Sequence, residues 1–223
     1  MIKKILFILI FFSSSKSYAL QELMGRYFFT LRLKKSLSLV TNLDLTLTPK
    51  DPRLSYFVIR PLFSFQFSHH WFLDIGPAIK KDFGSSITHN EVRALGDVRY
   101  ILTVDDFRFK GRVRFEGKWI DQEKDGEMVK SRPFHIRLRG LVQWNDFFNI
   151  SPRFFIYAGP EFFIEQNTPK NHHMNLGSIR WEGSIGRMIS NNFSAQIDIW
   201  YRQYIKQDKK DFATLIIRFD HHI

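Results

Sequence analysis

Cysteine is absent from this sequence of 223 residues, and long apolar runs are scarce. The lack of cysteine excludes disulfides, thiolate metal sites and cysteine nucleophiles, and it says little about the cellular compartment. Beyond residue 19, no apolar segment approaches the roughly 20 residues that a membrane-spanning helix needs. If this protein enters a membrane, it therefore does so as β-strands. No stretch rich in proline, glycine and serine follows residue 19 either, so we expect one domain without a linker.

Residues 1–19 have the parts of a cleaved secretory signal peptide. Lys3 and Lys4 form a basic start, an apolar run covers residues 5–12, and Ala19 ends a segment that contains small residues. The apolar run is too short to span a bilayer. We expect cleavage after Ala19, which leaves residues 20–223 as the single domain. Cleavage removes three lysines and no acid, so the formal net charge falls from +11 to +8.

Apolar and polar residues alternate with a period of two from about Tyr27 to Phe219. The pattern is clearest over residues 107–119, where phenylalanine, glycine, valine and tryptophan occupy odd positions while arginine, lysine and glutamate occupy even ones. Successive side chains of a strand point to opposite faces. One face is therefore apolar and aromatic, and the other is charged. This pattern favours a transmembrane β-barrel, whose outer surface meets lipid and whose interior meets water.

The alternation and the turn residues together predict eleven strands. They lie near residues 27–33, 37–47, 55–67, 71–80, 90–102, 107–120, 133–144, 153–165, 176–188, 193–204 and 212–219. Short connections alternate with longer polar ones, as in outer-membrane barrels whose short turns face the periplasm. The longer ones are expected near residues 48–54, 81–89, 121–132, 166–175 and 205–211.

This pattern predicts an all-β fold, an antiparallel up-and-down transmembrane β-barrel of about 10–12 strands. Because bacterial barrels usually have an even number of strands, a count of eleven predicts that a strand near residues 20–26 is missing or that one strand is misassigned. Pro61, Pro77 and Pro160 fall inside predicted strands, where a residue without an N–H weakens the ladder.

Five short motifs follow one another in a familiar order. They are Asn90-Glu91-Val92-Arg93, the strand of residues 107–119 with Arg112-x-Arg114-x-Glu116, Arg137-x-Arg139, Gly159-Pro160-Glu161-Phe162-Phe163, and Tyr201-Arg202-Gln203-Tyr204. Together they resemble a family of bacterial outer-membrane barrel proteins that is catalogued as a domain of unknown function. The resemblance implies a barrel in the outer membrane of a Gram-negative bacterium, and it implies no reaction.

The same alternation predicts which charged side chains line the lumen. The basic candidates are Arg32, Arg60, Lys80, Arg93, Arg99, Arg108, Lys110, Arg112, Arg114, Lys118, Arg137, Arg139, Arg153, Arg180, Arg202 and Arg218, and the acidic ones are Asp44, Asp74, Glu91, Asp97, Glu116, Glu161, Glu182 and Asp198. An excess of bases predicts a small pore that prefers anions. The alternative is a filled interior in which arginine and glutamate pair across a polar core.

Catalytic and metal sites have weak support. His135 shares the inward face with Arg137 and Arg139, so His135 with Glu91 or Glu161 is the candidate acid–base set for a lipid-modifying enzyme. A serine nucleophile needs a histidine and an acid within reach, and no Ser-x-His or His-x-Ser strand pair occurs. The histidines also lack the spaced partners of a metal site. We therefore expect no catalytic residue, no metal and no cofactor.

Aromatic residues dominate the outward parity, with phenylalanine alone supplying 24 of the 223 residues. The sequence therefore predicts an exported, integral outer-membrane β-barrel of unknown specific role. Its expected partners are outer-membrane lipid, the outer-membrane assembly machinery and small anionic solutes, and no nucleic acid. Three alternatives stay open: a structural or assembly component of the cell envelope, a lipid-modifying enzyme of the rim or lumen, and a soluble periplasmic barrel or sandwich that binds a ligand.

Overall fold

The alternating segments form long strands in the computed structural model, which describes residues 20–48, 51–83, 89–124, 127–146, 154–168, 171–205 and 210–223. In chain order the strands are β1 (Leu20–Lys34), β2 (Leu37–Thr48), β3 (Asp51–Gln66), β4 (Trp71–Asp82), β5 (His89–Val104), β6 (Phe107–Lys124), β7 (Glu127–Ser131), β8 (Phe134–Asn145), β9 (Phe154–Thr168), β10 (Asn171–Met188), β11 (Phe193–Tyr204) and β12 (Phe212–His222). Across these segments, no helix is long and apolar enough to cross a membrane.

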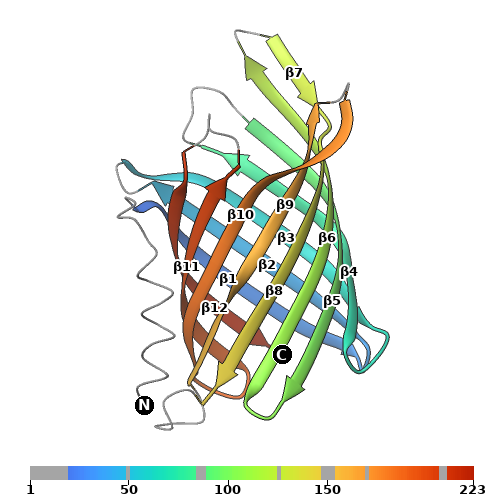
Figure 1. The fold of residues 1–223 in the computed structure, drawn as a ribbon, viewed down its shortest axis with the longest axis vertical. Helices are drawn as coiled ribbons and strands as arrows, with labels where there is room; N and C mark the ends of the chain where they lie inside the picture. The colour runs from blue at the N-terminus through green and yellow to red at the C-terminus, as the bar shows by residue number, and fades with distance from the viewer. Residues whose placement is uncertain are drawn as a thin grey trace.

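Eleven of these strands close into a barrel (Figure 1). Consecutive wall strands pair antiparallel, and β6 pairs with β5 on one side and with β8 on the other. Strand β7 pairs with the distal end of β6 and stands beyond the wall (Figure 1). The prediction of an all-β barrel of about 10–12 strands is confirmed.

The barrel closes between β1 and β12, which run parallel, with Leu23 opposite Leu215 and Tyr27 opposite Phe219. An odd number of up-and-down strands leaves the first and the last pointing in the same direction, so their pairing must be parallel. The expectation of a missing or misassigned strand is therefore wrong. Residues 20–26 lengthen β1 instead of forming another strand, and the expected antiparallel pairing fails at this one seam.

The connections differ between the two ends of the barrel. At one end, β5 and β6 are joined by a tight turn in which Asp105 adopts a left-handed conformation with φ 50°, as aspartate does in turns. At the other end, much of what was expected to be loop is strand, because β9 continues to Thr168, β10 begins at Asn171, and β7 occupies residues 127–131. Polar strand ends lack the apolar face by which a strand is recognised in a sequence, so these hairpins resemble loops there.

Three prolines lie at two gaps in the ladder without breaking the wall. The β3–β4 pairing skips the residues around Pro61 and Pro77, and the β8–β9 pairing skips those around Pro160. Glycines face these gaps, since a Cβ on Gly76 would overlap the carbonyl oxygen of Pro61, and a Cβ on Gly159 would overlap that of Gly140. Neighbouring strands approach closely at these points because glycine has no side chain.

The outer face of the wall is apolar and exposed. Phe63, Ile75 and Ile197 have 50–59% of their surface accessible, and exposed apolar residues recur on most strands. Exposed aromatic residues on this face include Phe63, Phe65, Phe67, Trp71, Phe107, Trp119, Phe134 and Trp181, in agreement with the outward parity expected for aromatics. A monomer in water rarely exposes so continuous an apolar surface. The polar and charged side chains lie on the other face, inside the barrel.

Candidate functional site: the charged barrel interior

All eight acidic side chains expected on the inward parity are buried. Glu116, Glu161 and Asp198 have no exposed surface, and the exposed fractions of Asp74 and Glu91 are 5%. The same burial holds for Asp44, Asp97 and Glu182. A buried carboxylate is costly unless cations and hydrogen-bond donors surround it. The barrel interior must therefore supply such partners.

Glu161 on β9 is held by arginines from two other strands. Arg112 Nη2 on β6 lies 2.5 Å from Glu161 Oε1, and Arg180 Nη2 on β10 donates to Glu161 Oε2. Arg180 also lies 2.8 Å from Glu182 Oε1, while Arg139 Nη1 on β8 is 3.7 Å from Glu182 Oε2. Because Arg112 reaches past β8 to β9, this cluster ties together four strands through their side chains.

A second cluster lies on β5, β6 and β8. Arg114 donates two hydrogen bonds of 2.6 Å to Asp97, in the two-pronged geometry that guanidinium and carboxylate favour. Glu116 accepts a hydrogen bond of 2.6 Å from Arg137 and lies 3.8 Å from Arg93. The neighbouring carboxylate, Glu91, pairs with Arg93 at 2.8 Å and with Lys118 at 3.7 Å.

A third cluster centres on Asp44 of β2, whose two oxygens are each 2.6 Å from an arginine, Arg26 on β1 and Arg60 on β3. Sequence reasoning missed Arg26 because the first strand was expected to begin at Tyr27. Continuing the alternation upstream would have found it. Four inward acids at or beyond the expected strand ends were missed as well, and they reduce the predicted excess of bases: Glu22, Asp82, Glu165 and Asp220.

The other basic candidates lie around these clusters. Their closest polar contacts are Arg99–Asp74 (2.5 Å), Lys110–Gln143 (2.6 Å), Arg218–Asp220 (2.8 Å), Arg202–Ser178 (2.9 Å) and Lys80–Asp82 (3.0 Å). Arg32 and Arg108 are exposed, near the ends of β1 and β6 that face the short turns. Arg153 lies outside the described residues.

Aromatic rings fill the space between the ion pairs. The guanidinium of Arg180 lies 3.6 Å from the centroid of a Trp200 ring. The guanidinium of Arg26 also contacts Trp200, at 4.5 Å from the centroid of a ring. Arg202 lies 4.1 Å from the ring of Phe163. Such cation–π contacts stabilise a cation away from water. The interior is therefore a packed polar core rather than a row of free charges.

The three acid–base candidates have other partners in the structure. His135 Nδ1 lies 3.9 Å from Glu165 Oε1, whereas Glu91 and Glu161 are engaged by arginines. In the described part of the chain, no group of three or more histidine, aspartate or glutamate side chains is arranged to hold a metal ion. The dominant chemistry of the interior is ion pairing.

These features define a class of protein, a closed β-barrel with an apolar outer face and an ion-paired interior. Residues 23–213 match the family described as a protein of unknown function, DUF2490, and the chain belongs to this family. The match extends from β1 into β12 and so covers the barrel, which confirms the resemblance to an uncharacterised family. No curated protein matches the chain.

Proposed function

We propose that this protein is an integral outer-membrane β-barrel of a Gram-negative bacterium, exported by a cleaved signal peptide. In this proposal it has no catalytic activity and serves as a closed structural or binding component of the cell envelope. The observation that carries the proposal is the combination of two faces, one of exposed apolar residues and one of buried ion pairs.

The outer face supports the membrane location. A soluble barrel keeps its apolar side chains inside, yet here Phe63, Ile75 and Ile197 point away from the interior. The buried side chains opposite them include carboxylates and arginines. In lipid this polarity is the favourable one, because an apolar exterior meets acyl chains and closure of the wall pairs its two edge strands, β1 and β12.

The burial of the acids supports a closed interior. A wide, water-filled lumen would expose Glu116, Glu161 and Asp198, and these side chains have no exposed surface. An anion-preferring pore stays a prediction from the basic excess, and it requires the layer of ion pairs to open. In the proposed closed barrel, lipid is the main partner of the outer face, and the outer-membrane assembly machinery acts on the protein during its biogenesis.

Reconstitution tests this proposal. The purified protein should migrate faster in cold detergent gels than after boiling, insert into lipid vesicles, and pass no steady current across a planar bilayer. Steady anion-selective steps that weaken in the Arg112→Glu and Arg114→Glu variants would contradict a closed interior and favour the pore. A protein that stays outside the vesicles would contradict the membrane location and favour a soluble barrel.

A further inference from the structure

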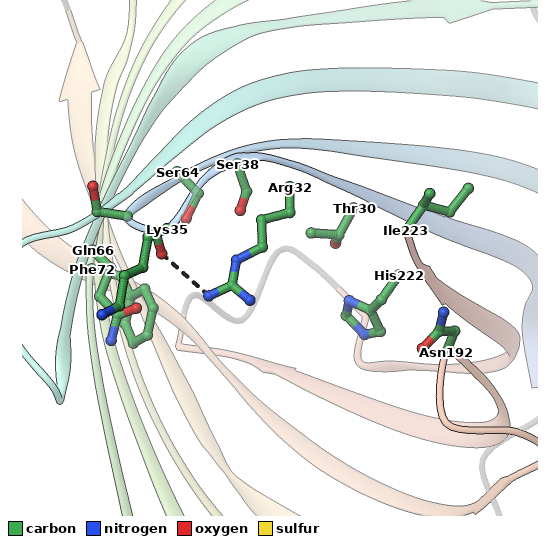
Figure 2. Close-up of a pocket in the computed structure, with 11 residues that line it drawn as sticks. Thr30, Arg32, Lys35, Ser38, Ser64, Gln66, Phe72, Asn192, His222 and Ile223 are labelled. Atoms are coloured by element: carbon green, nitrogen blue, oxygen red, sulfur yellow. Dashed lines mark hydrogen bonds between the residues drawn. The ribbon is translucent and has the colours of Figure 1, made fainter.

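A polar cavity of about 340 Å³ lies at the end of the barrel that carries the short turns. Its walls come from the ends of β1 and β12, the starts of β2 and β4, the end of β3, and the connection between β10 and β11. Figure 2 shows the Arg32 side chain projecting into this space, with Ser38 and Ser64 on one side and His222 and Asn192 on the other. We call this cavity the vestibule.

Basic and hydroxyl side chains dominate the lining. Arg32, Lys35 and His222 supply nitrogen donors, and Thr30 and Ser38 supply hydroxyl groups. None of the lining residues is aspartate or glutamate. The vestibule therefore offers donors in excess of acceptors, which is the chemistry of an anion site.

Two acids close to the vestibule, Asp74 and Asp220, are each paired with an arginine. Asp74 lies 2.5 Å from Arg99, which also donates to Ser64 Oγ at 3.0 Å on the vestibule wall. Asp220, two residues before His222, lies 2.8 Å from Arg218. Among the described residues, no carboxylate pairs with Arg32 or Lys35. The side chains that line the vestibule therefore include positive charges and no negative ones, which favours the binding of a small anion.

Among the described residues, the Arg32 guanidinium makes one hydrogen bond, which leaves other N–H donors for a ligand. The backbone N–H of Arg32 donates to Ile223 O at 2.9 Å, and its Nη2 donates to the Lys35 backbone oxygen at 3.3 Å (Figure 2). A guanidinium has five N–H donors in a fixed fork, and the Arg32 guanidinium projects into the cavity (Figure 2). Bidentate recognition of a phosphate group is the task for which this fork is best suited.

We propose that the vestibule binds the phosphate group of a small sugar phosphate. Arg32 and Lys35 engage the phosphate, hydroxyl and amide groups such as Ser38 and Gln66 bond the sugar hydroxyls, and the Phe72 ring provides an apolar surface for its carbon face. The cavity volume lies at the low end of the range for ligand pockets, which limits the ligand to a small solute. This proposal rests on the barrel and not on its membrane location.

Calorimetric titration of the folded full chain in detergent micelles with glucose 6-phosphate tests the proposal. Saturable binding is expected, together with weaker binding of inorganic phosphate and none of glucose. Arg32→Gln should lower the affinity about tenfold, a change of about 1.4 kcal/mol. The affinity of the Arg32→Lys variant should lie between those of the unaltered protein and Arg32→Gln, because lysine keeps the positive charge and lacks the forked guanidinium.

Arg132→Gln is the matched control. Arg132 is likewise exposed and likewise donates to a backbone oxygen, that of Ser131 at 2.9 Å, but it lies near β7 at the opposite end of the barrel. This variant should bind as the unaltered protein does. Equal losses in both variants, inorganic phosphate binding as tightly as glucose 6-phosphate, or no saturable binding would each overturn the proposal. Circular dichroism of each variant separates lost binding from lost folding.

Discussion

Replacement of Glu161 by glutamine tests whether the ion pairs hold the barrel together. Glu161 has no exposed surface and accepts ion pairs from Arg112 and Arg180, whose side chains are 11% exposed. Glutamine keeps the size of the side chain and removes its charge. Arg112 then loses its acidic partner inside the barrel, while Arg180 keeps Glu182 at 2.8 Å.

The expected loss of stability follows from this geometry. Removing one partner of a buried ion pair costs about 3–5 kcal/mol, because an uncompensated charge remains buried. Since Glu182 still compensates the charge of Arg180, we expect Glu161→Gln to lower the free energy of unfolding by about 3 kcal/mol, the lower end of this range. Reversible urea unfolding in detergent micelles, followed by the fluorescence of the five tryptophans, measures this difference.

A surface pair provides the control for this measurement. Asp121 and Arg132 are 3.5 Å apart and both close to half exposed, so Asp121→Asn should change the free energy of unfolding by less than about 1 kcal/mol. If Glu161→Gln lowers the free energy of unfolding no more than Asp121→Asn does, water reaches the interior ion pairs, and the prediction that they hold the barrel together is refuted. The Arg112→Gln variant and the double variant should show strong non-additivity, because one interaction links the two sites.

Two further predictions concern the wall. Gly159→Ala should destabilise the barrel by about 1–3 kcal/mol, because the new Cβ meets the carbonyl of Gly140, whereas Gly140→Ala meets nothing within 4 Å and should be tolerated; similar urea midpoints for the two variants would contradict this packing. Ile197 and Ile205 are both 50% exposed, but Ile197 lies within β11 and Ile205 follows its end. In a membrane, Ile197→Arg should cost about 2–4 kcal/mol and Ile205→Arg about 0–1 kcal/mol. Equal, small costs in vesicle refolding experiments would favour a soluble barrel.

The alternation of residue types was sufficient for much of the fold. A period of two needs no knowledge of partners, because each side chain of a strand points away from the next, and over residues 107–119 it separates the apolar outside from the charged inside. The same parity led to the eight buried acids. It loses its signal at polar strand ends, which is why the hairpin of β7 resembles a loop in the sequence. Arg26 was missed for another reason, because the first strand was expected to begin at Tyr27.

Closure and pairing were decided by the tertiary structure. Nothing local in β1 or β12 indicates that they pair in parallel, since that follows from the number of strands between them. Arg112 and Glu161 are 49 residues apart and meet because the barrel bends their strands toward a common interior. The vestibule likewise joins Arg32 to His222 from the two ends of the domain. The sequence alone determined which side chains face inward, because that depends on position along a strand. Which of them meet depends on register and closure around the whole barrel, and only the folded chain supplies these.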